Sequence, residues 1–146
     1  MFERSNVKSE RGNAMVEFAI VLPLLLIVVF GIIDFGRALY TANNLTAAVR
    51  EGARLASTQI SPDPTTAASQ AAVSTAVTNY VVAFGGNAGA PQVTETFNGG
   101  APPNMQSITV QIVSYPFTPL TPIANFVGFG TIQMSPSATF RWEGAP

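Results

Sequence analysis

One apolar run near the start of the chain limits how the rest can fold. It extends over residues 14–33, where Glu17 carries the only charge. At about 1.5 Å per residue, a helix of this length spans roughly 30 Å, which is the thickness of the hydrocarbon core of a bilayer. The run therefore predicts a transmembrane helix, with the remaining chain folded beyond the membrane.

The flanking charges predict the orientation of this helix. Three basic residues precede it: Arg4, Lys8 and Arg11. By the positive-inside rule they keep the N-terminus in the cytoplasm, so the C-terminal part is extracytoplasmic. A secretory signal peptide is the alternative. Its apolar core is shorter, about 7–15 residues, and ends in a small-residue cleavage site, which the sequence DFGRALY after this run does not provide.

Composition argues against an enzyme. The 146 residues include no His and no Cys, so the commonest general base, metal ligand and thiolate nucleophile are missing. The acids beyond the membrane region are scattered along the sequence: Glu51, Asp63, Glu95 and Glu143. We expect no catalytic residue, no metal site and no cofactor. The net charge of −1 also predicts no nucleic-acid partner.

Gly12 separates a polar leader, residues 1–12, from the apolar run, and Glu17 follows five positions later. Because glycine has no Cβ, a protease can close tightly on the backbone at this point. The alternative for Gly12 alone is a helix boundary at the membrane interface.

The sequence G-NAMVE-F, followed by an unbroken apolar helix, resembles the leader of the type IV pilin class. The continuation FAIVLPLLLIVVFGIIDFGRALYTANNLTAAVREGARLAS is more similar still to the TadE-like minor pseudopilins, and the resemblance covers residues 12–57. The motif blocks occur in the family's order: Glu17, Leu22-Pro23, Phe35-Gly36-Arg37 and Glu51-Gly52-Ala53-Arg54.

This resemblance implies cleavage between Gly12 and Asn13 by a prepilin peptidase. It also implies that Glu17 pairs with the new α-ammonium of a neighbouring subunit. Pairing removes the desolvation cost of both charges, as an intramembrane carboxylate requires. The alternative is that Glu17 snorkels to the cytoplasmic headgroups. Pro23 cannot donate a helical hydrogen bond, so we expect a kink at this position.

Beyond the membrane, the helix is expected to continue over residues 37–58, after a transmembrane part at 13–36. A seam of mostly small residues recurs along it at spacings of three and four: Ala42, Leu45, Val49, Gly52 and Ala56. Small residues let helices approach closely. The seam therefore predicts either a helix–helix contact within a pilus bundle or packing on the chain's own head.

Residues 59–146 predict an extracytoplasmic head. Asp63 and Pro64 form a good N-cap and first-turn pair. The helix that they begin carries an apolar stripe of Val73, Val77, Tyr80, Val81 and Phe84. Alternating runs near 93–97, 108–112 and 131–142 predict strands, and the Pro-rich segment 115–130 predicts a loop. The expected fold is α+β and pilin-like: a long N-terminal helix, a second helix and a small antiparallel sheet.

The sequence thus predicts a minor pseudopilin that is needed to assemble a Tad (Flp) pilus. We expect it in the inner membrane, with prepilin peptidase, other pilins, the Tad inner-membrane platform and membrane lipid as partners. The alternatives are an uncleaved membrane-tethered binding module, with the aromatic segment 115–130 as its ligand site, and a type II secretion pseudopilin. The FGR and EGAR blocks argue against the last of these.

Overall fold

The computed structural model describes residues 7–58, 65–86, 91–100, 104–121, 128 and 130–142. Two helices, α1 (Val7–Thr58) and α2 (Ala67–Ala83), precede five strands. The strands are β1 (Val93–Asn98), β2 (Ser107–Ile112), β3 (Tyr115–Phe117), β4 (Ile132–Met134) and β5 (Ser137–Arg141). The predicted α+β, pilin-like fold is confirmed, with a long N-terminal helix, a second helix and small antiparallel sheets.

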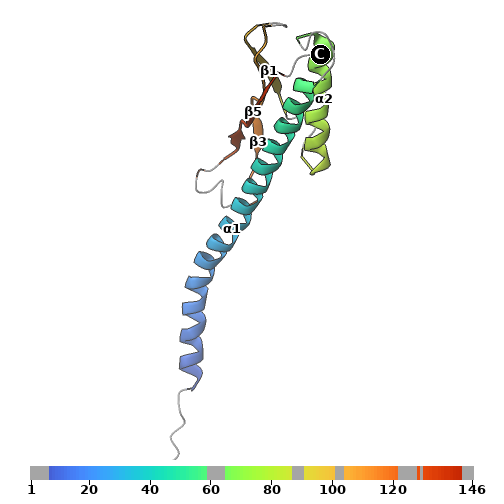
Figure 1. Cartoon of the computed structure of the whole chain (residues 1–146). Coiled ribbons are helices and arrows are strands. Elements are labelled where there is room, and N and C mark those ends of the chain that lie inside the picture. Colours follow the sequence, from blue (N-terminus) through green and yellow to red (C-terminus); the bar gives the residue numbers. More distant parts are fainter. Residues whose placement is uncertain are drawn as a thin grey trace, which may run out of the picture.

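The long helix α1 is a stalk whose first half stands free of the head (Figure 1). Its side chains there point outward: Phe18 is 63% exposed and Leu24 is 65% exposed. Within the described residues, this one helix is long and apolar enough to cross a membrane. Apolar side chains at this exposure have no partner in the described part of the head, which fits a single-pass membrane anchor.

The head is built around the second half of α1. In Figure 1, α2 lies along one side of α1 and the strands lie along the other. The helix packs against α2, β2 and β5. Fully buried side chains from α1, α2 and β2 meet in the core: Leu45, Val49, Val73, Val77, Val81, Ile108, Val110 and Ile112.

Helix α2 begins later than the sequence predicts. Thr66 is its N-cap, and the Thr66 hydroxyl accepts a hydrogen bond from the Ser69 backbone N–H at 3.3 Å. The prediction that Asp63 and Pro64 form the N-cap and first turn was therefore wrong, and both residues lie outside the described part of the chain. Val73, Val77 and Val81 are buried as predicted, whereas Tyr80 is largely exposed.

Two antiparallel sheets complete the head. In the first, β2 lies between β1 and β5, and Val110 stands opposite Glu95 on one side and Ala138 on the other. In the second, β3 pairs with β4. The Pro-rich segment was predicted as a loop, but its first residues form β3. Pro116 is exposed between buried Tyr115 and Phe117, which is how a two-stranded edge accommodates a proline.

The predicted seam on α1 faces the chain's own head in this structure. Leu45, Val49, Gly52 and Ala56 are buried there, and Ala42 is half-buried. A Cβ built on Gly52 would lie 2.4 Å from Val77 Cγ2 and 3.5 Å from Val110 Cγ1. Glycine at this position allows α1 to approach α2 and β2 at the same point.

Candidate functional site at the stalk and its junction with the head

The N-terminal part of the stalk presents Gly12, Asn13 and Glu17 on an exposed surface. Nothing lies within 4 Å of a Cβ built on Gly12. Within the part of the chain that the structure describes, Glu17 makes no hydrogen bond or ion pair. The three residues are therefore accessible to another molecule, which the predicted cleavage and charge pairing both require.

Helix α1 runs without interruption through Gly12, Asn13 and Pro23. The bond between Gly12 and Asn13 thus lies in its second turn, near the N-terminal end of the helix. The kink predicted at Pro23 stays a prediction.

The head is fastened to the stalk at Asp34, immediately after the apolar run. One carboxylate oxygen of Asp34 accepts a hydrogen bond from the Leu120 backbone N–H at 2.9 Å. The other accepts hydrogen bonds from the Thr121 backbone N–H at 3.3 Å and from the Thr121 hydroxyl. Asp34 therefore holds the segment after β3 against α1, close to the end of the predicted transmembrane part.

Arg37 lies one turn further along α1. Its guanidinium is 3.6 Å from Asp34 Oδ1, and its Cζ is 5.6 Å from the centroid of the Phe117 ring. Asp34 and Arg37 thus form an ion pair, in which Asp34 also accepts the hydrogen bonds from Leu120 and Thr121. The Arg37 side chain is 45% exposed, whereas that of Asp34 is 13% exposed.

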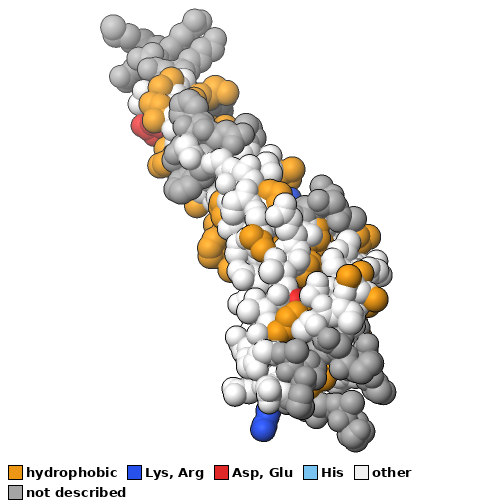
Figure 2. Space-filling model, turned by 90° about the horizontal axis from the view of Figure 1, so that it is seen from above, with side chains coloured by type: hydrophobic (Ala, Val, Ile, Leu, Met, Phe, Trp, Pro, Cys, Tyr) orange, Lys and Arg blue, Asp and Glu red, His pale blue; other side chains and the backbone are white. Residues whose placement is uncertain are grey.

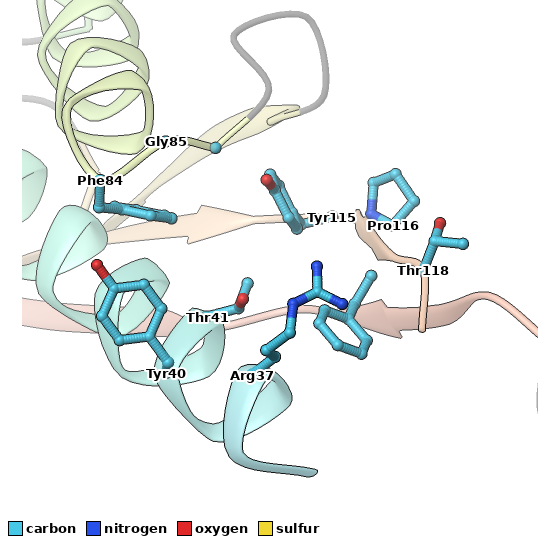
Figure 3. A pocket seen from close by; sticks show the side chains of 10 residues that line it. Arg37, Tyr40, Thr41, Phe84, Gly85, Tyr115, Pro116 and Thr118 are labelled. Carbon is cyan, nitrogen blue, oxygen red and sulfur yellow. The ribbon is translucent and has the colours of Figure 1, made fainter. Parts of the chain in front are cut away.

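A pocket of about 430 Å³ opens beside Arg37, between α1, the end of α2 and β3. In Figure 3, the Arg37 side chain rises from α1 toward Tyr115, Pro116 and Thr118, and Tyr40 and Phe84 lie at the other end. The Tyr40 and Phe84 rings meet edge to face, with centroids 6.4 Å apart. One cationic group thus faces a pocket whose other walls are aromatic rings and hydroxyl groups.

Higher on the stalk, Glu51 and Arg54 form a two-bond ion pair. Arg54 Nη2 and Nε donate to the two Glu51 carboxylate oxygens at 2.6 and 3.0 Å. The hydrogen bonds from Arg54 lower the pKa of Glu51. Both side chains are solvent-exposed, so the pair contributes little stability. The pair therefore belongs to a solvated face of the helix.

Glu95 occupies the inner face of β1, beside a groove of about 410 Å³ between β1 and α2. Its Oε2 atom is buried and has no hydrogen-bond donor among the described residues. Burial raises the pKa of this carboxyl group. A carboxylate without a donor at a half-buried position is unfavourable for the head.

Replacing Glu95 by Val is expected to stabilise the head by about 1–2 kcal/mol near pH 7, since it removes the unsatisfied carboxylate and places an apolar side chain opposite Val110. Burial raises the pKa of Glu95 in the folded head. The carboxyl group therefore contributes to stability at low pH, where it is protonated, and this contribution is lost as the pH rises through the native pKa. Glu95→Gln should lack this dependence. Denaturant unfolding followed by the fluorescence of Trp142 measures both effects.

Thr94→Val is the matched control, because Thr94 lies on the exposed face of the same strand. Its stability should stay within about 0.5 kcal/mol of that of the unmodified chain. If the difference between the unmodified chain and Glu95→Gln is the same at about pH 4 and about pH 8, the assigned cost of ionising Glu95 is wrong.

No group of three or more His, Cys, Asp or Glu side chains that could hold a metal ion occurs among the described residues. The face shown in Figure 2 is mostly uncharged, with only small patches of acidic and basic side chains. Such a surface offers no extended electrostatic footprint for a polyanion.

Residues 12–54 match the family model described as TadE-like protein. The N-terminal segment of the chain is TadE-like. The matched TadE-like segment starts at Gly12 and ends at Arg54, so it includes the exposed N-terminal residues, the apolar run, Asp34 and Arg37. Neither the curated proteins nor the solved structures gave a match.

The junction shows what sequence reasoning missed. Asp34, Arg37 and Tyr40 follow directly after the apolar run, and from the sequence alone they mark only the membrane interface. The structure places Asp34 against Leu120 and Thr121, far away in the sequence. The available signal was the spacing: an acid, a base and a tyrosine follow each other at intervals of three residues at the end of an apolar helix. The sequence did not indicate which residues they contact.

Proposed function

We propose that the chain is a minor pseudopilin that a prepilin peptidase cleaves between Gly12 and Asn13, and that it is required for assembly of a Tad (Flp) pilus. The N-terminus lies in the cytoplasm, the stalk spans the inner membrane, and the head is extracytoplasmic. Its partners are the peptidase, other pilins and the Tad inner-membrane platform. In this role it needs neither cofactor nor catalytic residue.

The observation that carries this proposal is the TadE-like match, which begins at the proposed cleavage site itself. Two features of α1 support it. Glu17 is exposed on a surface that no part of the described head covers. The apolar side chains around it are also exposed, as a segment buried first in lipid and then among other pilins requires.

The position of the scissile bond is compatible with proteolysis. A peptidase needs an accessible and extended backbone, and a helix unwinds more readily near its end, where it frays, than in its middle. Gly12 lowers the helix stability further, by about 1 kcal/mol relative to Ala. Cleavage then converts Asn13 into a free α-ammonium one helical turn before Glu17.

Gly12→Leu is expected to block processing, because the branched side chain occupies the space in which the peptidase closes on bare backbone. Mass spectrometry of the protein isolated from membranes that contain a prepilin peptidase should find Asn13 as the first residue of the unmodified chain and Met1 in the variant. Gly31→Leu is the control, because a Cβ at Gly31 also meets nothing within 4 Å and the residue lies far from the cleavage site.

One alternative function has an observation in its favour, the pocket beside Arg37. A membrane-tethered binding module would use this pocket and would keep its leader. The same mass spectrum separates the two functions: an unmodified chain that starts at Met1 in the presence of the peptidase would contradict the pseudopilin proposal and favour the tether.

A further inference from the structure

We infer that the pocket beside Arg37 binds the phosphate-bearing headgroup of a phospholipid in the extracytoplasmic leaflet. The inference rests on the proposed membrane orientation of α1 and adds a ligand to it. The occupant is a lipid of the same bilayer that the stalk crosses, held where the head meets the membrane.

The height of the pocket supports this occupant. Arg37 follows the last residue of the apolar run, Ile33, by four positions, which is about 6 Å along a helix. The headgroup layer on each side of a bilayer is roughly 5–7 Å thick. A stalk that spans the hydrocarbon core with residues 14–33 therefore places the Arg37 guanidinium at the level of the lipid phosphates.

The charges at the pocket favour an anion. Arg37 is the only basic residue between Asn13 and Val49 in the sequence. No acidic side chain lines the described pocket. The nearest carboxylate, on Asp34, lies 3.6 Å from the guanidinium and does not line the pocket. The Arg37 guanidinium lines the pocket, its side chain is 45% exposed, and it can donate to a phosphate oxygen.

The remaining walls suit the rest of a headgroup. Thr41 and Thr118 provide hydroxyl groups, and Tyr40 and Phe84 provide rings that are stable at a membrane interface. The volume of about 430 Å³ is in the range of small-ligand pockets and far below what a pair of acyl chains would fill. The acyl chains would instead lie along the exposed apolar face of α1.

The test is native mass spectrometry of the full chain in a mild detergent, with phosphatidylglycerol as the probe. The unmodified protein should retain one phosphatidylglycerol, and Arg37→Gln should bind it about fivefold more weakly, the effect of one basic residue at a lipid surface. Arg50→Gln is the matched control, because Arg50 is exposed on the same helix and does not line the pocket. Equal losses in both variants would overturn the site.

Two further probes identify the ligand chemistry. Diacylglycerol with the same acyl chains lacks the phosphate and should not be retained; equal retention would overturn headgroup recognition. Millimolar inorganic phosphate should leave the retained lipid in place, because a free anion lacks the acyl chains held along α1. Displacement would assign the pocket to a soluble anion and overturn the lipid assignment.

Folding and anchoring are checked separately. Arg37→Lys keeps the charge but loses the planar guanidinium, so it should bind the lipid more weakly than the unmodified chain and more tightly than Arg37→Gln. It also serves as the second variant if Trp142 fluorescence shows that the Gln variant does not fold. A Lys variant that binds as weakly as Gln would overturn recognition of charge. If the unmodified protein is absent from the membrane fraction, the proposed function fails; if it is present there but retains no phosphatidylglycerol, only this inference fails.

Discussion

Glu17→Ala is expected to abolish pilus assembly while leaving the protein anchored in the membrane. The substitution removes a charge that costs roughly 2.5–3.5 kcal/mol at a helix centre on insertion scales, and less near the interface, so insertion should be unchanged or improved. Assembly should fail because the α-ammonium of a neighbouring Asn13 would be desolvated without a partner, a loss of several kcal/mol. Surface pili counted by electron microscopy, together with membrane fractionation, measure both results.

Glu17→Gln should be nearly as defective, because it keeps the shape and the hydrogen-bonding capacity of the side chain but removes the charge. Glu51→Ala is the control on the same helix: its partner Arg54 is solvent-exposed, so its loss should cost at most about 0.5 kcal/mol and leave piliation intact. Normal piliation of the Glu17→Ala strain would contradict charge pairing. It would favour the account in which Glu17 snorkels to the headgroups.

The stalk was predictable because one physical length determines it. A bilayer of about 30 Å demands about twenty apolar residues, and the helix continues beyond them because nothing breaks it before Thr58. The buried valines of α2 were predictable for a similar reason, since residues three and four apart share a helix face. The exposure of Tyr80 was not predictable. The apolar residues of α2 cover a wider face of the helix than the face that the head buries.

The start of α2 shows the limit of local signals. Asp63, Thr65 and Thr66 are all acceptable N-caps. In the structure Thr66 takes this role, and its hydroxyl accepts a hydrogen bond from the Ser69 backbone N–H. The N-cap preferences of Asp and Thr are too similar for the sequence alone to choose among these three residues.

The junction was beyond sequence reasoning for a different reason. Asp34 recognises the backbone N–H groups of Leu120 and Thr121, and backbone groups have no sequence signature. The pairing of β3 with β4 poses the same problem, because each strand has only three residues, too few for a clear alternation. The pocket beside Arg37 depends on both contacts.

Gly52→Leu is expected to destabilise the head by about 3 kcal/mol, which for a domain of this size lowers the melting temperature by roughly 12–24 °C. A Cβ at position 52 already lies 2.4 Å from Val77 Cγ2, and a leucine adds three more carbons in the same direction. Val77 cannot move aside, because a β-branched side chain in a helix has one strongly preferred rotamer and this one is fully buried. Thermal unfolding followed by Trp142 fluorescence measures the change.

Two further variants test whether the effect comes from the contact between Gly52 and Val77: a leucine at Gly31 and an alanine at Val77. Gly31→Leu inserts the same side chain in the same helix where nothing lies within 4 Å, so the head should melt at its original temperature. Gly52→Ala should be destabilising despite a gain of about 1 kcal/mol in helix propensity, and combining it with Val77→Ala should cost less than the sum of the two single changes, by about 0.5–3 kcal/mol. Strictly additive losses, or equal melting of the two leucine variants, would mean that α1 and α2 do not approach each other at Gly52 as closely as the structure places them.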